Sequence, residues 1–279
     1  MPESIQSARG FAEVNGAKLY YEVRGAGHPL VLLHEGIADS RMYDDQFNAF
    51  AQRYRVVRFD LRGFGQSDLP PRDRPVALHE DLYGLLAFLL IKKTYMLGMS
   101  MGGAIALDFT LAHPAMVDAL ILVASGVSGY DMTSFEAAYQ AIGEEIEEAL
   151  KRGDYERASE LETRIWVDGP DRTPQQVDPG VRQRVYEMNL HNYRTMGTVE
   201  FPPPQELDPP AIARLGEVAV PTCLIIGDKD VHEMLSITEK LEQGIPGARK
   251  VVMHDVAHAL NMEQPEEFNR IVLDFLASL

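Results

Sequence analysis

Two patterns of apolar residues alternate along this chain. In the first, short runs are rich in apolar residues, and the runs at 30–34 and 117–125 are nearly continuous, as expected of strands that are covered on both faces of a sheet. These runs lie at 30–34, 55–60, 93–98, 117–125, 220–227 and 249–255, with a further early strand at 18–23. In the second, apolar residues recur every three or four positions, as on one face of a helix, at 44–54, 78–90, 101–114 and 264–279. The alternation predicts an α/β fold, in which helices flank a mostly parallel sheet.

The alternation stops between residues 130 and 215. This stretch holds helical patterns and the proline-rich segment "FPPPQELDPP" (201–210), and it shows no clear strand pattern. We therefore expect two units, a core formed by residues 1–129 and 216–279 and a helical cap, or lid, formed by residues 130–215. The cap is expected to cover the carboxyl edge of the sheet.

The composition narrows the class of protein. The 279 residues are 46% hydrophobic, enough for a substantial core, and their formal net charge is −16. This charge argues against nucleic acid as a partner, because phosphates would be repelled. The single cysteine, Cys223, excludes an intrachain disulfide and a cysteine-rich zinc site. No apolar run is long enough to span a membrane, and "MPESIQSARG" lacks the apolar stretch of a secretory signal, so we expect a cytoplasmic protein.

The segment "YMLGMSMGGAIAL" (95–107) places Ser100 between an apolar strand and an apolar helix. Residues 98–102 fit the pattern G-x-S-x-G, whose sharp turn leaves no room for a Cβ two positions before or after the serine. Two roles are open to Ser100: a helix N-cap at a tight corner, or a nucleophile beside the N–H groups of a helix N-terminus. We favour the nucleophile, because the strand and helix that this turn requires are both predicted.

A serine nucleophile needs a histidine as its base. Of the eight histidines we favour His258, which lies in the loop between the last strand and the last helix. Such loops lie at the carboxyl edge of the sheet, where the serine turn also lies. His254 ends the strand itself, and His232 and His191 lie in less defined places.

An acid must orient the histidine, and it is expected after the strand "TCLIIG". The sequence "GDKD" offers Asp228 and Asp230 there. Asp228 directly follows a glycine and can cap the turn. We favour Asp230, which lies further along the loop and can reach across to the next one.

These motifs together resemble the α/β-hydrolase fold, and the resemblance covers nearly the whole chain. The matching segments, in the family's order, are "LVLLHEGIADSRMYDDQ", "RVVRFDLRGFGQSD", "LGMSMGGAIAL", "CLIIGDKD" and "AHALNMEQPEEFNRIVLDFL". The elbow and the last helix are most similar to those of serine-nucleophile carboxylesterases and enol-lactone hydrolases. The resemblance implies that the helical cap is inserted after the sixth core strand, and that the loop 60–67 holds a neighbouring loop near the site.

The resemblance also implies a role for each matching residue. Ser100 would be the nucleophile, His258 the general base and then the general acid, and Asp230 the orienting carboxylate. The oxyanion hole would use the backbone N–H groups of Met101 and Gly36.

The chain departs from the family's pattern at two positions. Glu35 follows His34 where glycine is usual, and Ala257 precedes the histidine where glycine is also usual. The Glu35 side chain either points away as a surface residue or lies near the site and alters its acidity.

A serine at the elbow, where epoxide- and halide-processing members carry aspartate, favours acyl transfer from a small carboxylic ester or lactone to water. Hydrolysis of a carbon–carbon bond or perhydrolysis by the same triad, and ligand binding without catalysis, stay open as alternatives. No metal or organic cofactor is implied, no oligomeric state is indicated, and the expected partner is a small, uncharged or weakly polar acyl substrate. Candidate apolar walls of its pocket are Ile37, Met42, Tyr43, Met99 and Trp166.

Overall fold

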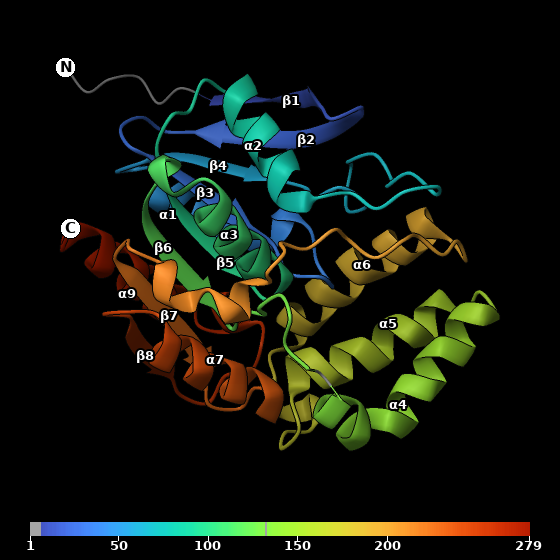
Figure 1. Cartoon of the computed structure of the whole chain (residues 1–279). Helices are drawn as coiled ribbons and strands as arrows, with labels where there is room; N and C mark the ends of the chain where they lie inside the picture. The colour runs from blue at the N-terminus through green and yellow to red at the C-terminus, as the bar shows by residue number, and fades with distance from the viewer. Residues whose placement is uncertain (1–6, 132) are drawn as a thin grey trace.

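The centre of the molecule is an eight-stranded sheet (Figure 1), in a computed structural model that describes residues 7–131 and 133–279, with the backbone alone for 133–138. Its strands are β1 (Ser7–Val14), β2 (Ala17–Arg24), β3 (Pro29–Leu33), β4 (Arg55–Phe59), β5 (Thr94–Met99), β6 (Val117–Val123), β7 (Thr222–Gly227) and β8 (Arg249–Met253). They lie in the order β1-β2-β4-β3-β5-β6-β7-β8, parallel from β4 to β8. The sheet therefore brings the carboxyl ends of the central strands to one edge.

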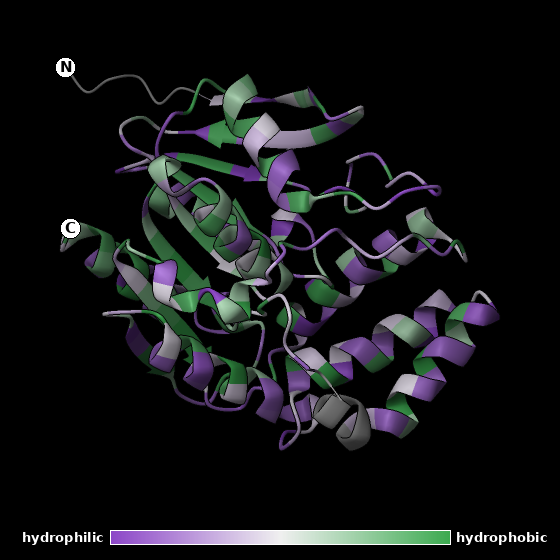
Figure 2. Cartoon of the chain, viewed as in Figure 1, coloured by the Kyte–Doolittle hydropathy of each residue, from purple (hydrophilic) through white to green (hydrophobic). Residues whose placement is uncertain are grey.

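Helices cover both faces of this sheet. They are α1 (Asp44–Phe50), α2 (Leu78–Phe88), α3 (Met101–Ala112), α7 (His232–Gly244), α8 (Leu260–Glu263) and α9 (Pro265–Ala277). The helices α2 and α3 pack together on one face, and α1 and α9 pack together on the other (Figure 1). Because both faces are covered, the central strands are mostly apolar, as their colour in Figure 2 shows, with polar Asp118 and Thr222 near the starts of β6 and β7. The predicted α/β-hydrolase fold, with its mostly parallel sheet, is confirmed.

The first strand, β1, is absent from the expectations drawn from the sequence. It pairs antiparallel with β2 through a tight turn in which Val14 faces Ala17 and both Asn15 and Gly16 have positive φ. Asn-Gly is a strong hairpin signal, but the first four residues of β1 are exposed or half-buried. An edge strand that faces solvent has no continuous apolar run to reveal it.

The chain between β6 and β7 forms α4 (Thr133–Lys151), α5 (Tyr155–Thr163), a π-helical turn (Arg164–Asp168) and α6 (Pro179–Met196). These helices lie outside the sheet (Figure 1), and α4 and α5 carry many hydrophilic residues (Figure 2). Asn192 of α6 donates to the Ala38 carbonyl (3.0 Å) and accepts from the Gly65 N–H (3.0 Å). The amide of one buried side chain thus joins α6 to the loops after β3 and β4.

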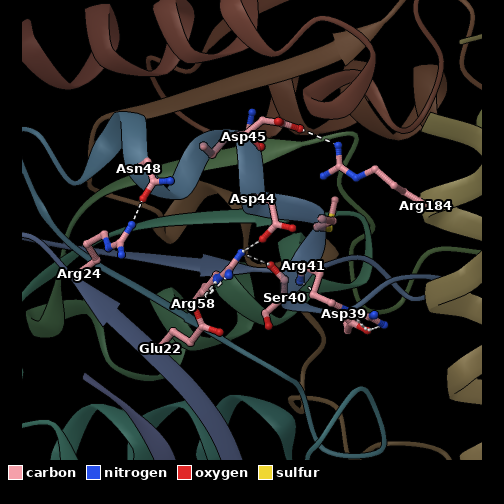
Figure 3. Close-up of polar contacts among 12 residues, drawn as sticks. Glu22, Arg24, Asp39, Ser40, Arg41, Asp44, Asp45, Asn48, Arg58 and Arg184 are labelled. Carbon is pink, nitrogen blue, oxygen red and sulfur yellow. Dashed lines mark hydrogen bonds and ion pairs between the residues drawn. The ribbon is translucent and has the colours of Figure 1, made fainter. Parts of the chain in front are cut away.

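Charged side chains form contacts around α1 (Figure 3). The buried guanidinium of Arg58 in β4 contacts Glu22 of β2 (2.9 Å), Asp44 of α1 (2.5 Å) and the Ser40 carbonyl (3.2 Å). Arg184 of α6 forms an ion pair with Asp45 of α1 (2.8 Å). An ion pair thus links α6 to α1, in addition to the Asn192 contacts that join α6 to the loops after β3 and β4.

Candidate active site

The strand-to-helix turn at Ser100 has the strained geometry that its glycines predict. Ser100 has φ 53° and ψ −116°, and a Cβ added to Gly98 would lie 2.3 Å from the Gly102 carbonyl oxygen. A Cβ added to Gly102 would lie 2.4 Å from the Leu33 carbonyl oxygen. Both contacts are far closer than packed atoms allow, so only glycine fits at these two positions. Positive φ at a serine costs about 1–3 kcal/mol and persists here because β5 and α3 fix the turn.

The Ser100 hydroxyl does not cap the helix that follows it. Its side chain makes no capping hydrogen bond, whereas its backbone carbonyl accepts from the N–H groups of Gly103 (3.0 Å) and Ala104 (3.1 Å). The side chain is half-buried and lines two cavities. The geometry therefore fits the nucleophile interpretation better than the N-cap interpretation.

The structure brings Asp230, not Asp228, to His258. His258 Nδ1 lies 2.9 Å from Asp230 Oδ2, and both residues are about 2% exposed. Asp228 instead accepts from the Asp255 N–H (2.8 Å) and contacts His254 Nδ1 (3.0 Å) at the surface. The carboxylate at Nδ1 keeps a proton on that nitrogen and leaves Nε2 as the basic atom.

His258 also contacts the segment between β6 and β7. Its backbone N–H donates to the Trp166 carbonyl (3.2 Å), and the two rings lie 4.7 Å apart. Burial lowers the pKa of His258, but the charge and hydrogen bond of Asp230, together with Glu35, raise it above its ordinary value. The two other histidines that were considered as the base lie elsewhere. His191 Nε2 contacts the Gly65 carbonyl oxygen (3.1 Å), and His232 is exposed at the start of α7.

Glu35 lies inside the site rather than at the surface. It is 1% exposed, and one of its carboxylate oxygens lies 3.7 Å from His258 Nε2. Burial raises the pKa of Glu35 from 4.5 to about 7; His258 opposes the shift, and the negative charges of Asp230 and Glu162 add to it. The second of the two orientations left open by the sequence is the one observed.

The backbone that carries Glu35 is held by the preceding histidine. His34 is buried, its Nε2 accepts from the Leu61 N–H (2.9 Å), and its Nδ1 lies 2.7 Å from the Glu35 carbonyl oxygen. Because a backbone N–H can only donate and a carbonyl can only accept, the ring is neutral with its proton on Nδ1. Burial lowers the pKa of His34, which favours this neutral form. The loop after β3 is therefore fixed before any ligand arrives.

The two proposed oxyanion donors belong to neighbouring segments. Gly36 and Met101 line the same cavity, and a Cβ added to Gly36 would lie 3.9 Å from Met101 Sδ. Met101 is the first residue of α3, so its N–H belongs to the unpaired N-terminal turn of the helix.

The loop after β4 supports this edge of the site. Asp60 accepts from the N–H groups of Ser40 (2.9 Å) and Gln66 (2.8 Å). Gly65 has φ 52°, and a Cβ there would lie 2.2 Å from Asp60 Oδ2. These contacts join the loops after β3 and β4, in agreement with the structural role inferred for residues 60–67.

Two cavities meet at the serine. One, of about 280 Å³, is shared by Ser100 and His258, and we call it the acidic cavity. It is lined by Glu35, Gly36, Ile37, Phe64, Ser100, Met101, Glu162, Trp166, Asn189, Tyr193, Met196 and His258. The other, of about 340 Å³, shares Ser100, Met101 and Trp166 and extends along α3 and the loop after β6.

Only part of the expected pocket wall is found. Ile37 and Trp166 line the acidic cavity. Met42, Tyr43 and Met99 are 0% exposed and belong to the hydrophobic core, so the prediction is corrected for these three. The Tyr43 hydroxyl, for example, donates to the Leu33 carbonyl (2.8 Å) and points into the core.

Other cavity residues were not foreseen. Glu162 comes from α5, Asn189, Tyr193 and Met196 from α6, and Phe64 from the loop after β4. The two helices carry no motif that marks these positions, so no signal in a single sequence could have found them. Phe64 lies within the recognised loop 60–67, and its apolar side chain was the one available hint.

The raised pKa of Glu35 predicts a pH-dependent stability. A carboxyl that binds its proton more tightly when folded stabilises the fold fully below pH 4.5 and loses this contribution as the pH rises to about 7. Glu35→Gln should remove this loss, raising the free energy of unfolding at pH 8 by up to about 3 kcal/mol while changing it little at pH 4.5. Thermal unfolding of both proteins across this range measures the difference. Glu239→Gln, at an exposed position of α7, is the control and should show no such divergence; parallel curves for the Glu35 variant and wild type would contradict the prediction.

Comparisons with known proteins agree with the fold. The family model described as alpha/beta hydrolase fold matches residues 29–265. The AB hydrolase superfamily protein YisY of Bacillus subtilis (strain 168) is 26% identical over 262 residues, 92% of this chain and 94% of that protein.

Two solved structures share the fold. The enol-lactonase of Burkholderia xenovorans LB400 has a TM-score of 0.78 at 22% identity, covering 96% of this chain and 100% of that one. The esterase RhEst1 of Rhodococcus sp. ECU1013 has a TM-score of 0.78 at 24% identity, covering 99% of both chains.

The chain belongs to the alpha/beta hydrolase fold family. Hydrolase is the enzyme class that this family and the names of its relatives support. Among the residues that the structure describes, no helix combines the length and the apolar character that crossing a membrane requires.

Proposed function

We propose that this protein is a serine hydrolase that cleaves a small carboxylic ester, lactone or related acyl substrate through an acyl-enzyme. The triad would be Ser100, His258 and Asp230. One observation carries the proposal: a serine held at positive φ, with no capping bond, shares a cavity with a buried histidine whose other nitrogen is held by a buried aspartate.

The proposed reaction begins at the Ser100 hydroxyl. Its oxygen attacks the substrate carbonyl carbon while His258 Nε2 takes the proton, and Asp230 stabilises the imidazolium that results. The N–H groups of Gly36 and Met101 would bind the negative oxygen of the tetrahedral intermediate. The intermediate then expels the leaving group, which takes the proton from His258 and leaves Ser100 acylated.

Hydrolysis of the acyl-enzyme repeats the sequence with water as nucleophile. His258 deprotonates the water, and collapse of the second intermediate returns the proton to Ser100. The two cavities that meet at Ser100 offer separate space for the acyl part and the leaving part of the substrate. Residues 130–215, which contribute Glu162 and Trp166, would act as the cap that shapes both.

Covalent labelling tests the nucleophile directly. A fluorophosphonate should react with Ser100: the Ser100 oxygen forms a bond to phosphorus, the P–F bond breaks and fluoride leaves, His258 takes the hydroxyl proton, and the phosphoryl oxygen would occupy the oxyanion hole. Mass spectrometry of the peptides should place one adduct at Ser100, with heat-unfolded protein unlabelled. An adduct at another serine, or equal labelling of the unfolded chain, would rule the proposal out.

A further inference from the structure

The acidic cavity has a charge that the proposed hydrolysis does not use. Its lining includes two carboxyl side chains, Glu35 and Glu162, and among the described residues that line it there is no Lys or Arg. An acyl-transfer site needs neither carboxyl group for the steps derived above. Their presence therefore calls for a ligand-based explanation.

Glu35 is 1% exposed and lines the acidic cavity. In the part of the chain that the structure describes, neither of its oxygens has a hydrogen-bond partner. The 3.7 Å separation from His258 Nε2 is longer than a hydrogen bond allows. A buried, unpartnered carboxylate is costly, and native structures rarely keep one without a function. A substrate group that donates to these oxygens would satisfy them.

Glu162 places a second negative charge on the wall formed by α5. Asn189 donates to it from α6 (3.4 Å). Burial raises the pKa of Glu162, and hydrogen bonds from Tyr193 and Asn189 oppose that shift. Glu162 is near enough to Glu35 for its charge to raise the pKa of Glu35. Two carboxyl groups that repel each other across the acidic cavity would both be stabilised by a cation between them.

The rest of the lining also suits a cation. The aromatic residues Phe64, Trp166 and Tyr193 line the same cavity. Ammonium groups bind favourably against aromatic faces, most strongly where water is excluded. An anionic substrate, in contrast, would meet both carboxyl groups and the net negative charge of the whole chain.

We propose that the acidic cavity selects acyl substrates that carry an ammonium group close to the scissile carbonyl, with Glu35 as the main ligand of that group. Glu35 directly precedes Gly36, the proposed oxyanion donor, and both line the acidic cavity, so a cation bound by Glu35 would lie close to a carbonyl bound by Gly36. Glu162 supplies the second charge. The proposal rests on the proposed function and names the substrate class of the same site.

Ionisation of Glu35 is part of this recognition. Burial raises the pKa of Glu35 to about 7, so an ammonium ligand that requires the carboxylate should bind more tightly as the pH rises from 6 to 8. The titratable groups that face Glu35 are His258, Asp230, Glu162 and Tyr43. Among these, His258 favours the carboxylate, while Asp230 and Glu162 disfavour it.

Two p-nitrophenyl esters that differ only in the terminal group provide the test. The 3-aminopropanoate ends in an ammonium group, and the butanoate ends in a methyl group of similar size. The kcat/KM for each ester is divided by the rate constant of the same ester with free imidazole, which corrects for the difference in intrinsic reactivity. For wild type at pH 7.5, the corrected kcat/KM should favour the ammonium ester by about tenfold or more. Glu35→Gln should reduce this preference by about tenfold or more, and Glu162→Gln should reduce it less. Glu239→Gln should leave the preference as in wild type.

An inhibition measurement on wild type tests the same proposal without depending on the folding of any variant. Butylammonium should inhibit butanoate hydrolysis competitively, at a concentration about tenfold or more below that required of butanol. Equal inhibition by the two, or an ester preference that Glu35→Gln leaves unchanged, would overturn the proposal. If the butanoate is hydrolysed in a Ser100-dependent way without an ammonium preference, only this inference fails. If neither ester is hydrolysed through Ser100, the proposed function fails with it.

Discussion

Ser100→Ala is expected to lower kcat/KM for p-nitrophenyl butanoate by about 10⁴-fold or more, because the attacking oxygen is lost while the rest of the site remains. The fold should be unaffected, since the Ser100 side chain makes no capping bond and the backbone contacts of the turn do not involve the hydroxyl. Steady-state kinetics, with thermal unfolding of the same preparation, measures both quantities. Residual turnover by the variant would come from the oxyanion donors and substrate binding alone.

Ser125→Ala is a matched control for this substitution. Ser125 follows β6, is 1% exposed, and donates its hydroxyl hydrogen to the Gly126 carbonyl (2.7 Å), so it is a nearby serine with an ordinary structural bond. Its loss should leave kcat/KM within about threefold and lower stability by about 1 kcal/mol. If the Ser100 variant retained activity within tenfold of this control, another group would have to be the nucleophile.

The sheet and the serine turn could be predicted from the sequence because each restricts the residue types at neighbouring positions. A strand buried on both faces, such as β3, has to be apolar, and the turn at Ser100 has to carry glycine at positions 98 and 102. The strand β1 shows no such restriction, because most of its residues face solvent. Local physical constraints are visible in one sequence when they restrict which residue types fit.

The cavity wall was harder to predict, since it depends on which way a side chain points after folding. Met99 and Ile37 are both apolar and both adjoin a recognised motif, yet Met99 is buried in the core and Ile37 lines the cavity. The charge at Glu162 depends on how α5 packs against the rest of the molecule, and its helical pattern is typical of any amphipathic segment. Glu35 could be recognised as unusual, but only the position of His258 shows that its carboxyl group faces the site.

The second large loss of activity is expected at Asp230, the one of the two aspartates after β7 that contacts His258. Asp230→Asn should lower kcat/KM by about 10³- to 10⁴-fold, because an amide no longer neutralises the imidazolium and can bind the wrong tautomer of His258. The pH dependence should change as well. Burial lowers the pKa of His258, and the net shift is upward because Asp230 and Glu35 outweigh burial. Without the Asp230 charge, the pH at which kcat/KM reaches half its plateau should therefore move down.

Asp228→Asn makes the same chemical change two residues away and separates this role from the general loss of a charge. Asp228 is bonded to the Asp255 N–H and to the exposed His254, and an asparagine side chain can keep the first of these bonds. Its kcat/KM should stay within about threefold of wild type and its pH profile should not move, because His258 is in contact with the other carboxylate. If both variants lost activity equally, the acid would act through the fold of the loop and not through the imidazole. A loss confined to Asp230→Asn, with the downward movement of the pH profile, would instead show a carboxylate that acts on the proton of His258.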